Sequence, residues 1–407
     1  MHVLLIHQGF VARDEAGGTR HLELMRELVK RGHAATVIAG PTSYLSGVAD
    51  GSRRKNRVVD GVSVMYAWVL ATRSRNVLVR TLGFLSFTVS SFFAALGVRR
   101  VDVLWGTSPP IFQAAAAYIA ARLRGKSFCL EVRDLWPAFL IDAGLLRNPL
   151  LIGLARWLER RLCLGAECVV VNSPGFVDHL RSLGVPPQRI VLVPNGVDVG
   201  AFPDDVNGVP LRREWGIGED ALVAMYTGAH GLMNDLGVLL NVAEQLRAVP
   251  DVRIVLVGDG REKASLIAQA SKRALSNVVF VPPQPKSRMP EVLAAADVCV
   301  ATLRPVPMFR TVYPNKVFDY MAAGRPTVLA IDGVIREVIE RASGGVYVQP
   351  GDTQGITRAL LGYRNDPEMG RRHGENARAY VTEHFDRAKE APKLEAVLRD
   401  LASRGRR

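Results

Sequence analysis

The 407-residue sequence has few of the residues that build metal centres or disulfide frameworks. Its four cysteines, Cys129, Cys163, Cys168 and Cys299, show no CxxC spacing, and Cys129 and Cys299 stand inside apolar, strand-like runs. HExxH and EF-hand spacings are also missing. We therefore expect no structural zinc, no metal site and no cofactor, and the free thiols fit a reducing cytoplasm.

The sequence also lacks a secretory signal, an uninterrupted membrane span and a nucleic-acid-binding motif. The opening run MHVLLIHQGF has no basic leader and only four consecutive apolar residues, which indicates a buried first strand. Thr81–Val98 is uncharged, but the Ser and Thr residues within it favour a helix packed in a domain, with one apolar face available to lipid. Helix-turn-helix, zinc-finger and aromatic RNA-binding patterns do not occur, so we expect no nucleic-acid partner.

Positive charge and apolar residues are both abundant. The formal net charge is +13, and 48% of the residues are hydrophobic. The apolar content is sufficient for two or three domain cores. The excess of positive charge favours a polyanionic partner, such as a nucleotide or an anionic membrane surface.

Short β-branched runs alternate with amphipathic stretches along the whole chain, which predicts parallel sheets covered by helices. The cycle restarts near residue 222, so we expect two α/β domains. The predicted strands of the first half are Val3–Ile6, Ala35–Ile38, Val62–Tyr66, Val101–Trp105, Phe128–Val132, Cys168–Val171 and Ile190–Val193. Those of the second half are Leu222–Tyr226, Ile254–Val257, Val278–Val281, Val298–Ala301, Thr327–Ala330 and Val346–Val348.

The domain junction is expected in residues 194–210, where Pro, Asn, Gly and Asp cluster and periodicity lapses. We assign residues 1–198 to an N-terminal Rossmann-like domain and 199–380 to a C-terminal domain. Residues 381–407 read as a C-terminal helix that crosses back to the first domain. Because open α/β sheets bind ligands beyond the carboxyl ends of their strands, a nucleotide is expected in a cleft that the two domains face.

A glycine pair follows the first predicted strand. Gly17 and Gly18 precede Thr19 and Arg20 at the start of a predicted helix. Glycines at a helix start let backbone N–H groups approach an anion closely, so a diphosphate could bind there. A plain turn with a helix cap would explain the same residues.

A second segment, Tyr313–Pro326, carries charged groups on a short predicted helix. Asn315 can cap the helix, Lys316 places a cation in its first turn, and Asp319 lies about one turn further along. A cation at this helix end opposes the helix dipole, which favours a bound anion nearby. Asp319 could accept hydrogen bonds from ribose hydroxyls. The alternative is that Lys316 and Asp319 form a surface ion pair.

The chain resembles glycosyltransferase family 4 over nearly its whole length. PNKVFDYMAAGRPTV, at 314–328, is similar to the donor-binding helix of that family, and the other family patterns follow in order: AGGTRHLELMRELVKRGHAATV, LVPNGVD, LVGDG, and GVIREVIE followed by VQPGD. WGTSPP at 105–110 and EVRDLWP at 131–137 resemble the N-acetylfucosamine-transferase-like branch, whose enzymes build O-antigen and capsule units.

The resemblance implies a GT-B fold, two Rossmann-like domains facing a cleft, with residues 1–198 on the acceptor side and 199–380 as the nucleotide-sugar donor domain. It also implies a retaining, metal-independent transfer of a sugar from a nucleotide diphosphate donor, with UDP-sugars favoured. Asp319 would hold the donor ribose and Lys316 would face the diphosphate, with Gly17 and Gly18 cradling it from the opposite domain. Gly258 marks a strand end near the nucleotide, where a simple turn is the other reading. The further donor-binding candidates are Gly228, Gly231, Arg310, Pro314, Asn315 and Val317.

Two positions depart from the family pattern. The first glutamate of the family's pair corresponds to Thr311, so the carboxylate that touches the sugar is absent or replaced. The Arg and Lys that usually follow the first strand of the donor domain are also missing from the run GAHGLMN at 228–234. Phosphate charge would then depend more on Lys316, on Arg310 or Arg304, and on helix N-termini such as the one near Gly231.

The candidate catalytic residues lie mainly in the run EVRDLWP. Charged residues at the carboxyl end of a buried strand are placed where ligands bind, so we name Asp134, Glu131 and Arg133. Asp134 is expected nearest the acceptor hydroxyl, where it would take its proton or orient it. A structural ion pair of Arg133 with either carboxylate is the alternative. His230, and also His7, could face the same cleft, although lone histidines more often satisfy a backbone group.

Basic and apolar residues adjoin at two places in the first domain. Such surfaces attract anionic headgroups and insert aromatic rings at the lipid boundary. We therefore expect a peripheral enzyme on the inner face of the cytoplasmic membrane, acting on a lipid-linked sugar or a polysaccharide acceptor. Ordinary domain packing under a basic exterior is the alternative. The two sets are Arg73, Arg75, Arg80, Phe84, Leu85, Phe87, Phe92 and Phe93, and Arg147–Leu151 with Arg156, Trp157, Arg160 and Arg161.

Two other functions remain compatible with this sequence. A nucleotide-sugar epimerase of similar architecture would convert a donor without any acceptor. A non-catalytic nucleotide-binding protein, suggested by Thr311 and by the missing Arg and Lys, would bind a nucleoside diphosphate without releasing it from a donor.

Overall fold

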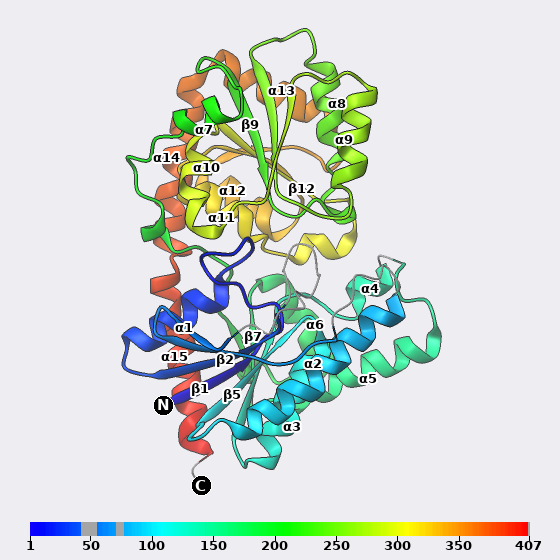
Figure 1. The fold of residues 1–407 in the computed structure, drawn as a ribbon, viewed down its shortest axis with the longest axis vertical. Helices are drawn as coiled ribbons and strands as arrows, with labels where there is room; N and C mark the ends of the chain where they lie inside the picture. The colour runs from blue at the N-terminus through cyan, green and yellow to red at the C-terminus, as the bar shows by residue number, and fades with distance from the viewer. Residues whose placement is uncertain (42–54, 71–76, 143, 406–407) are drawn as a thin grey trace. The chain divides into compact units, whose positions relative to one another are not determined.

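The computed structural model describes residues 1–41, 55–70, 77–142 and 144–405, and its ribbon is drawn in Figure 1. The chain forms two compact units. The first comprises Met1–Ala12, Thr19–Pro194 and Ala388–Arg407, and the second comprises Arg13–Gly18 and Asn195–Arg387. The chain thus enters the second unit twice, once for a six-residue segment near its start.

The first unit is built on an eight-stranded sheet with the order β3-β4-β2-β1-β5-β6-β7-β8. Every neighbouring pair is parallel except β3 and β4, which pair antiparallel. The strands are β1 His2–Ile6, β2 Ala34–Ala39, β3 Arg57–Val59, β4 Val62–Tyr66, β5 Val103–Ser108, β6 Ser127–Val132, β7 Cys168–Val171 and β8 Ile190–Leu192. The α-helices are α1 Arg20–Lys30, α2 Val77–Gly97, α3 Ile111–Leu123, α4 Ala138–Asp142, α5 Pro149–Gly165 and α6 Val177–Ser182.

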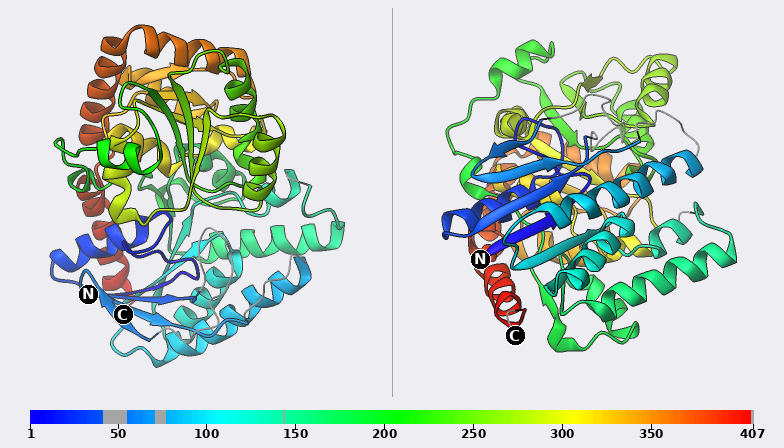
Figure 2. Two further views of the ribbon diagram at one scale, coloured as in Figure 1. Left: turned by 45° about the horizontal axis from the view of Figure 1, so that its top comes forward. Right: turned by 60° about the horizontal axis from the view of Figure 1, so that its bottom comes forward.

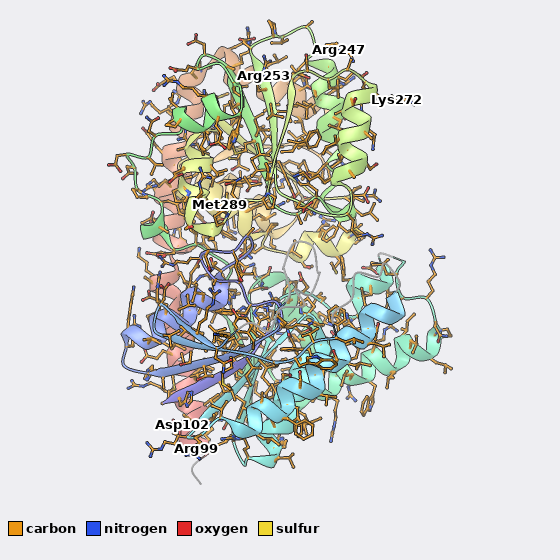
Figure 3. The ribbon with its side chains drawn as sticks, viewed as in Figure 1. Arg99, Asp102, Arg247, Arg253, Lys272 and Met289 are labelled. Atoms are coloured by element: carbon orange, nitrogen blue, oxygen red, sulfur yellow. The ribbon has the colours of Figure 1, made fainter. Side chains whose placement is uncertain are left out.

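The sheet of the first unit is buried because its central strands are apolar on both faces. Strands β1, β5 and β6 are buried along almost their whole length, and Trp105 is fully inside. Asp102, at the end of the unit where β5 begins (Figure 3), accepts a 2.9 Å hydrogen bond from the backbone N–H of His2. This bond fixes the start of β1 against β5.

The C-terminal helix α15, Arg387–Arg404, belongs to the first unit from Ala388 onward. Leu394, Leu398 and Leu401 on this helix pack into the core formed by β1, β2 and β5. The helix is the red element beside the blue strands in Figure 2. The last residues of the chain therefore complete the core of a unit that begins with the first residues.

The second unit has an all-parallel six-stranded sheet with the order β11-β10-β9-β12-β13-β14. The strands are β9 Leu222–Thr227, β10 Val252–Val257, β11 Val278–Val281, β12 Val298–Thr302, β13 Thr327–Ala330 and β14 Gly345–Tyr347. The α-helices are α7 Val209–Glu214, α8 Gly237–Gln245, α9 Lys263–Lys272, α10 Met289–Ala294, α11 Asn315–Ala322, α12 Val334–Ala342, α13 Thr353–Asn365 and α14 Pro367–His384.

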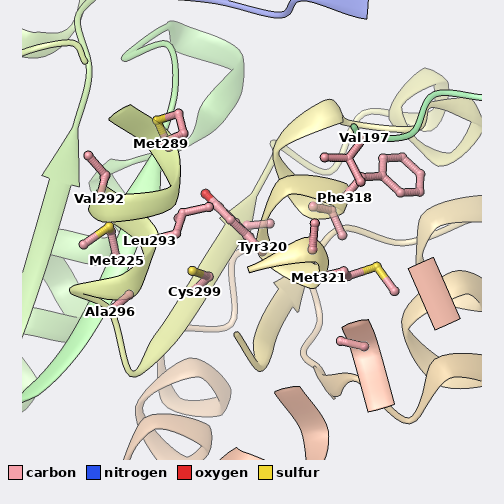
Figure 4. Packing of buried hydrophobic residues seen from close by; sticks show 14 of the residues in the cluster. Val197, Met225, Met289, Val292, Leu293, Ala296, Cys299, Phe318, Tyr320 and Met321 are labelled. Atoms are coloured by element: carbon pink, nitrogen blue, oxygen red, sulfur yellow. The ribbon is translucent and has the colours of Figure 1, made fainter. Parts of the chain in front are cut away.

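Helix α11 is held in place by the buried side chains on one of its faces. Phe318, Tyr320 and Met321 are fully buried in a cluster with side chains from α10 and β12 (Figure 4). The Tyr320 hydroxyl also accepts a 2.9 Å hydrogen bond from the backbone N–H of Thr227 at the end of β9. These contacts set the position of the polar residues on the opposite face of the helix.

The structure confirms the predicted α/β class, and the six predicted strands of the second half correspond to β9–β14. The predicted strand Val101–Trp105 is wrong at its start, because β5 begins at Val103 and runs on to Ser108. Strand β3 was not predicted, since it is short and only partly buried. The segment Thr81–Val98 lies within α2 except for Val98, and within the described residues no helix has the length and apolar character needed to cross a bilayer.

Candidate functional site

In the second unit, two glycines stand where neighbouring strands end. Gly228 follows β9 and Gly258 follows β10, both with positive φ, of 131° and 146°. A Cβ on Gly258 would lie 1.9 Å from the carbonyl oxygen of Gly228. Because no other residue tolerates that approach, glycine is required for the two strand ends to meet. At these two positions the carboxyl edge of the sheet therefore presents backbone atoms that no side chain covers.

Lys316, in the first turn of α11, reaches this edge. Its Nζ lies 3.9 Å from the centroid of the Tyr226 ring and 2.5 Å from the Tyr226 hydroxyl, with Asn234 Oδ1 at 3.3 Å. A Cβ on Gly228 would lie 3.3 Å from the same Nζ. Burial lowers the pKa of Lys316 to about 7. No carboxylate pairs with Lys316 in the described part of the chain, so its charge is available to an anion.

The segment Arg13–Gly18 meets the same helix. The backbone N–H groups of Lys286 and Ser287 donate to the carbonyls of Glu15 and Arg13 at 3.0 Å, which attaches the segment to the second unit. A Cβ on Gly18 would lie 3.2 Å from Asn315 Nδ2. From the sequence, Gly17 and Gly18 are expected in the first domain. The structure instead groups them in one unit with Asn315 and Lys316.

Asp319 does not pair with Lys316. It forms a 2.6 Å ion pair with Lys286, a residue from the loop after β11, and both side chains are 14% exposed. The surface pairing of Lys316 with Asp319 that the sequence left open is therefore not formed. Asp319 keeps its place on the partly exposed face of α11, one turn beyond Lys316.

The remaining donor candidates fall into two groups. Pro314 precedes α11 as its N-terminal cap residue, and Val317 is fully buried beneath it. Arg310 is exposed and lies 3.2 Å from a carboxylate oxygen of Asp332, so its charge is partly neutralised. Gly231 precedes a single 3-10 turn, Leu232–Asn234, rather than a longer helix.

His230 is enclosed by the two glycine strand ends. It is 0% exposed, neither ring nitrogen has a hydrogen-bond partner among the described residues, and a Cβ on Gly258 would lie 3.3 Å from its Nε2. Burial and the nearby charge of Lys263 lower the pKa of His230 to about 4. The ring is therefore neutral at physiological pH and packs inside the loop that follows β9.

In the first unit, Asp134 and Arg133 follow the end of β6. Arg133 donates from Nε to the Thr107 hydroxyl and from Nη2 to the Pro109 carbonyl, both at 2.8 Å. Asp134 is partly buried, and among the described residues no side chain donates a hydrogen bond to its carboxylate. Burial raises the pKa of Asp134 to about 6, against the opposing charge of Arg133. The Arg133–Asp134 ion pair considered above is not formed.

Glu131 has a different environment from Asp134. It is 0% exposed, with Oε1 2.8 Å from Arg20 Nε and Oε2 2.5 Å from His21 Nε2. Arg20 also donates to the carbonyls of Pro194 and Val193. Burial alone would raise the pKa of Glu131, but His21 and Arg20 outweigh it and hold that pKa well below its usual range. Both oxygens of Glu131 are therefore engaged by α1.

His7 follows β1 and packs against this group. Its ring centroid is 4.3 Å from that of His21, and its Nδ1 is buried with no hydrogen-bond partner in the part of the chain that the structure describes. Burial, followed by the charge of His21, lowers the pKa of His7 well below its usual value. His7 is thus a neutral ring packed against His21.

Sequence reasoning missed several residues that the structure brings to these sites. Tyr226 and Lys286 flank Lys316 and Asp319, and Arg20 and Thr107 hold Glu131 and Arg133. Tyr226 ends a predicted strand and Lys286 follows another, so their position at strand ends was the available signal. Arg20 carried no comparable signal, because its partner lies 111 residues away.

The first unit also exposes apolar side chains on adjoining helices. Leu82, Leu85, Val89, Phe93 and Leu96 form one exposed stripe along α2, and Leu150, Leu151, Leu154 and Trp157 form another on α5. Helix α3 contacts both α2 and α5. Phe87, named above with the surface, is instead fully buried. Arg73, Arg75 and the Arg80 side chain lie outside the described residues.

Family models match both halves of the chain. Residues 16–196 match a glycosyl transferase 4-like domain, and residues 221–366 match glycosyl transferases group 1. The putative colanic acid biosynthesis glycosyl transferase WcaI of Escherichia coli K12 is 26% identical over 356 residues, covering 83% of this chain and 87% of that protein. The O-antigen chain mannosyltransferase C of Escherichia coli is 24% identical over 60% of this chain and 63% of that protein.

Solved structures share the fold across both units. Sucrose-phosphate synthase from Thermosynechococcus elongatus has a TM-score of 0.78 at 18% identity and covers 99% of each chain. HepE of Anabaena, in complex with UDP-glucose, has a TM-score of 0.73 at 17% identity and covers 98% of this chain and 100% of its own. WaaG, a glycosyltransferase involved in lipopolysaccharide biosynthesis, has a TM-score of 0.70 at 15% identity and covers 97% and 99%. The chain therefore belongs to the family 4 glycosyltransferases and has their GT-B fold.

Proposed function

We propose that this glycosyltransferase transfers a sugar from a nucleotide diphosphate donor to a lipid-linked or polysaccharide acceptor in cell-surface glycan synthesis, with retention of anomeric configuration and without a metal ion. The observation that carries the proposal is Lys316, a partly buried cation with no carboxylate partner in the described part of the chain, at the glycine-lined carboxyl edge of a parallel sheet. The named functions of WcaI and of the O-antigen mannosyltransferase support the choice of pathway.

On the donor side, the diphosphate binds Lys316 and the backbone N–H groups at Gly17 and Gly18. Asn315, at the start of α11, adds an amide beside Gly18. The ribose binds Asp319, whose carboxylate is already oriented by Lys286. The diphosphate can approach the backbone at Gly228, Gly231 and Gly258 because glycine has no side chain. Arg310 lies at the outer edge of the donor site. UDP-sugars are the first candidates, since HepE was solved with UDP-glucose.

On the acceptor side, Asp134 accepts a hydrogen bond from the incoming hydroxyl. The acceptor oxygen bonds to the anomeric carbon while the bond from that carbon to the diphosphate oxygen breaks. The diphosphate leaves with the electron pair, and the hydroxyl proton passes to it or to Asp134. Arg133 and Glu131 are positioning residues in this scheme, because their polar atoms are held by the protein.

The acceptor is proposed to reach the enzyme at an anionic membrane surface. The exposed stripes on α2 and α5 present aromatic and aliphatic side chains. The exposed cations Arg147, Arg156, Arg160 and Arg161 lie beside or on α5. Apolar insertion combined with anionic headgroup attraction is the pattern of peripheral membrane binding. The protein would then work on the cytoplasmic face of the membrane.

A donor panel tests the proposal. The purified protein would be incubated with UDP-, GDP- and dTDP-sugars, bacterial lipid extract and EDTA, and nucleoside diphosphate release would be measured with and without the extract. We expect one donor to be consumed only when lipid extract is present, and the anomeric configuration of the donor to persist in the product. Donor conversion without acceptor would indicate an epimerase, and binding without consumption would indicate a non-catalytic protein.

Variants of the proposed donor-binding residues distinguish specific donor binding from background hydrolysis. We expect Asp319→Ala to weaken donor binding at least tenfold, because a buried charge-assisted hydrogen bond is lost. The matched control is Glu340→Ala, which removes an exposed carboxylate that pairs with Arg336 on the same helix. Equal donor affinity in the Asp319→Ala variant and the wild type would show that Asp319 does not bind the donor.

A further inference from the structure

A cavity of the second unit lies at the edge of the sheet opposite the donor candidates. It has a volume of about 550 Å³. Its lining includes Leu222 at the start of β9 and three residues that immediately precede strands, Asp251, Asp297 and Pro326. Gly228 and Gly258 follow the other ends of β9 and β10. Six strand residues at about 3.3 Å each separate the two edges by roughly 20 Å.

The cavity is polar, and most of its charges are already paired. Four lining arginines have carboxylate partners: Arg212 with Asp297, Arg364 with Asp251, Arg371 with Glu375, and Arg378 with Asp204. A fifth lining arginine, Arg325, has no ion pair in the described part of the chain, and its buried Nε has no hydrogen-bond partner. Burial lowers the pKa of Arg325 from its usual value.

The backbone around Arg325 is fixed. Helix α11 ends at Ala322, and Gly324, with φ of 63°, turns the chain so that the Arg325 N–H donates to the Tyr320 carbonyl. A Cβ on Gly374 of α14 would lie 2.1 Å from the Gly324 carbonyl oxygen, so α14 packs directly on this turn. The guanidinium is thus presented from a rigid turn rather than from a free surface loop.

We propose that this cavity binds a small organic phosphate, with Arg325 as the residue that holds the phosphate group. An unpaired guanidinium that is partly removed from water gains more from an anion than a solvated surface arginine does, because its desolvation has already occurred on folding. The cavity size is in the range used for small metabolites. The paired carboxylates at Asp204 and Glu375 face the rest of such a ligand and favour hydroxyl groups over a second charge.

The proposal is tested with glycerol 3-phosphate and orthophosphate as probes and glycerol as the uncharged control. Binding would be measured by isothermal titration calorimetry on the full-length wild type, Arg325→Gln, Arg364→Gln and Lys316→Met. Arg364→Gln is the matched control, since Arg364 lines the same cavity but is paired with Asp251 at 2.8 Å. Lys316→Met weakens the donor site, which also attracts phosphate.

We expect glycerol 3-phosphate to bind the cavity of the wild type, Arg364→Gln and Lys316→Met with the same affinity, and to bind that of Arg325→Gln at least tenfold more weakly. Glycerol should not bind. In phosphate-free buffer the melting temperature of Arg325→Gln should be equal to or above that of the wild type, because an unpaired buried charge is removed. If Lys316→Met loses phosphate binding and Arg325→Gln keeps it, or if the wild type binds no phosphate, the proposed cavity site does not exist.

Discussion

The ammonium group of Lys316 lies 3.9 Å from the centroid of the Tyr226 ring and 2.5 Å from its hydroxyl. The phenol oxygen donates in turn to the Ala229 carbonyl at 2.8 Å, so Tyr226 accepts from the lysine while being fixed by the backbone. The contact stabilises the lysine without neutralising it. A cation held in this way is prepared for an anionic ligand.

Donor affinity should depend on pH through Lys316. Its pKa is lowered to about 7 in the free protein, and a diphosphate binds the protonated form. Affinity is therefore full below pH 7 and falls as the pH rises, by up to about tenfold per unit. We expect UDP to bind at least about tenfold more weakly at pH 8.5 than at pH 7, a window in which the UDP phosphate charge is nearly constant because its last pKa is about 6.

Lys316→Arg and Lys316→Met are the controls for this dependence. The arginine variant keeps its charge over the whole window and should bind UDP with an affinity that does not change with pH. The methionine variant should bind at least tenfold more weakly at pH 7. A wild-type affinity that stays constant from pH 7 to pH 8.5 would contradict the assignment of Lys316.

Asp134 should control turnover rather than donor binding. We expect Asp134→Asn to lower kcat by about 10²–10⁴-fold while UDP affinity changes less than twofold. The wild-type rate should fall as the pH drops through about 6, where the carboxylate becomes protonated. Asp142→Asn, in the exposed end of α4, is the matched control and should retain full activity. A normal kcat for Asp134→Asn would rule out its catalytic role.

Glu131 should contribute to stability. Glu131→Gln leaves Arg20 buried without its carboxylate, which costs about 3–5 kcal/mol in the free energy of unfolding. Because the pKa of Glu131 is lowered by folding, this contribution is present above the ordinary glutamate pKa and is lost as the pH falls through the folded-state value. Urea denaturation at pH 7 and at lower pH measures both effects.

The exposed pair Arg336–Glu340 is the comparison for Glu131. Its side chains are 40% and 50% exposed, so Glu340→Gln should change the free energy of unfolding by no more than about 1 kcal/mol. Equal stability losses in Glu131→Gln and Glu340→Gln would show that burial of the first pair has no energetic consequence.

The stripes on α2 and α5 should bind anionic vesicles. We expect sedimentation with phosphatidylglycerol-containing vesicles but not with pure phosphatidylcholine, and weaker binding at high salt. Phe93→Ser with Trp157→Ser should reduce vesicle binding at least tenfold, since each side chain loses about 1.5–3 kcal/mol of burial. Ile267→Ser, on an exposed helix of the second unit, should have no effect. Equal binding by both variants would place the membrane contact elsewhere.

The sequence was sufficient to predict where most strands lie. Strands buried on both faces read as mainly apolar runs, and this signal is local, so Cys168–Val171 and Thr327–Ala330 were predicted with the observed bounds. The turns at Gly228 and Gly258 and the helix start within residues 314–328 could be predicted for a similar reason. Turn and helix-start signals are encoded within a few neighbouring residues.

The partners of the charged residues were decided only by the tertiary structure. Lys316 meets Tyr226 across 90 residues, and Glu131 meets Arg20 across 111. Such contacts depend on which strands become neighbours and at what register, which no local pattern specifies. Periodicity determines which side of a helix is buried, whereas the group that a polar side chain meets is set by the path of the whole chain.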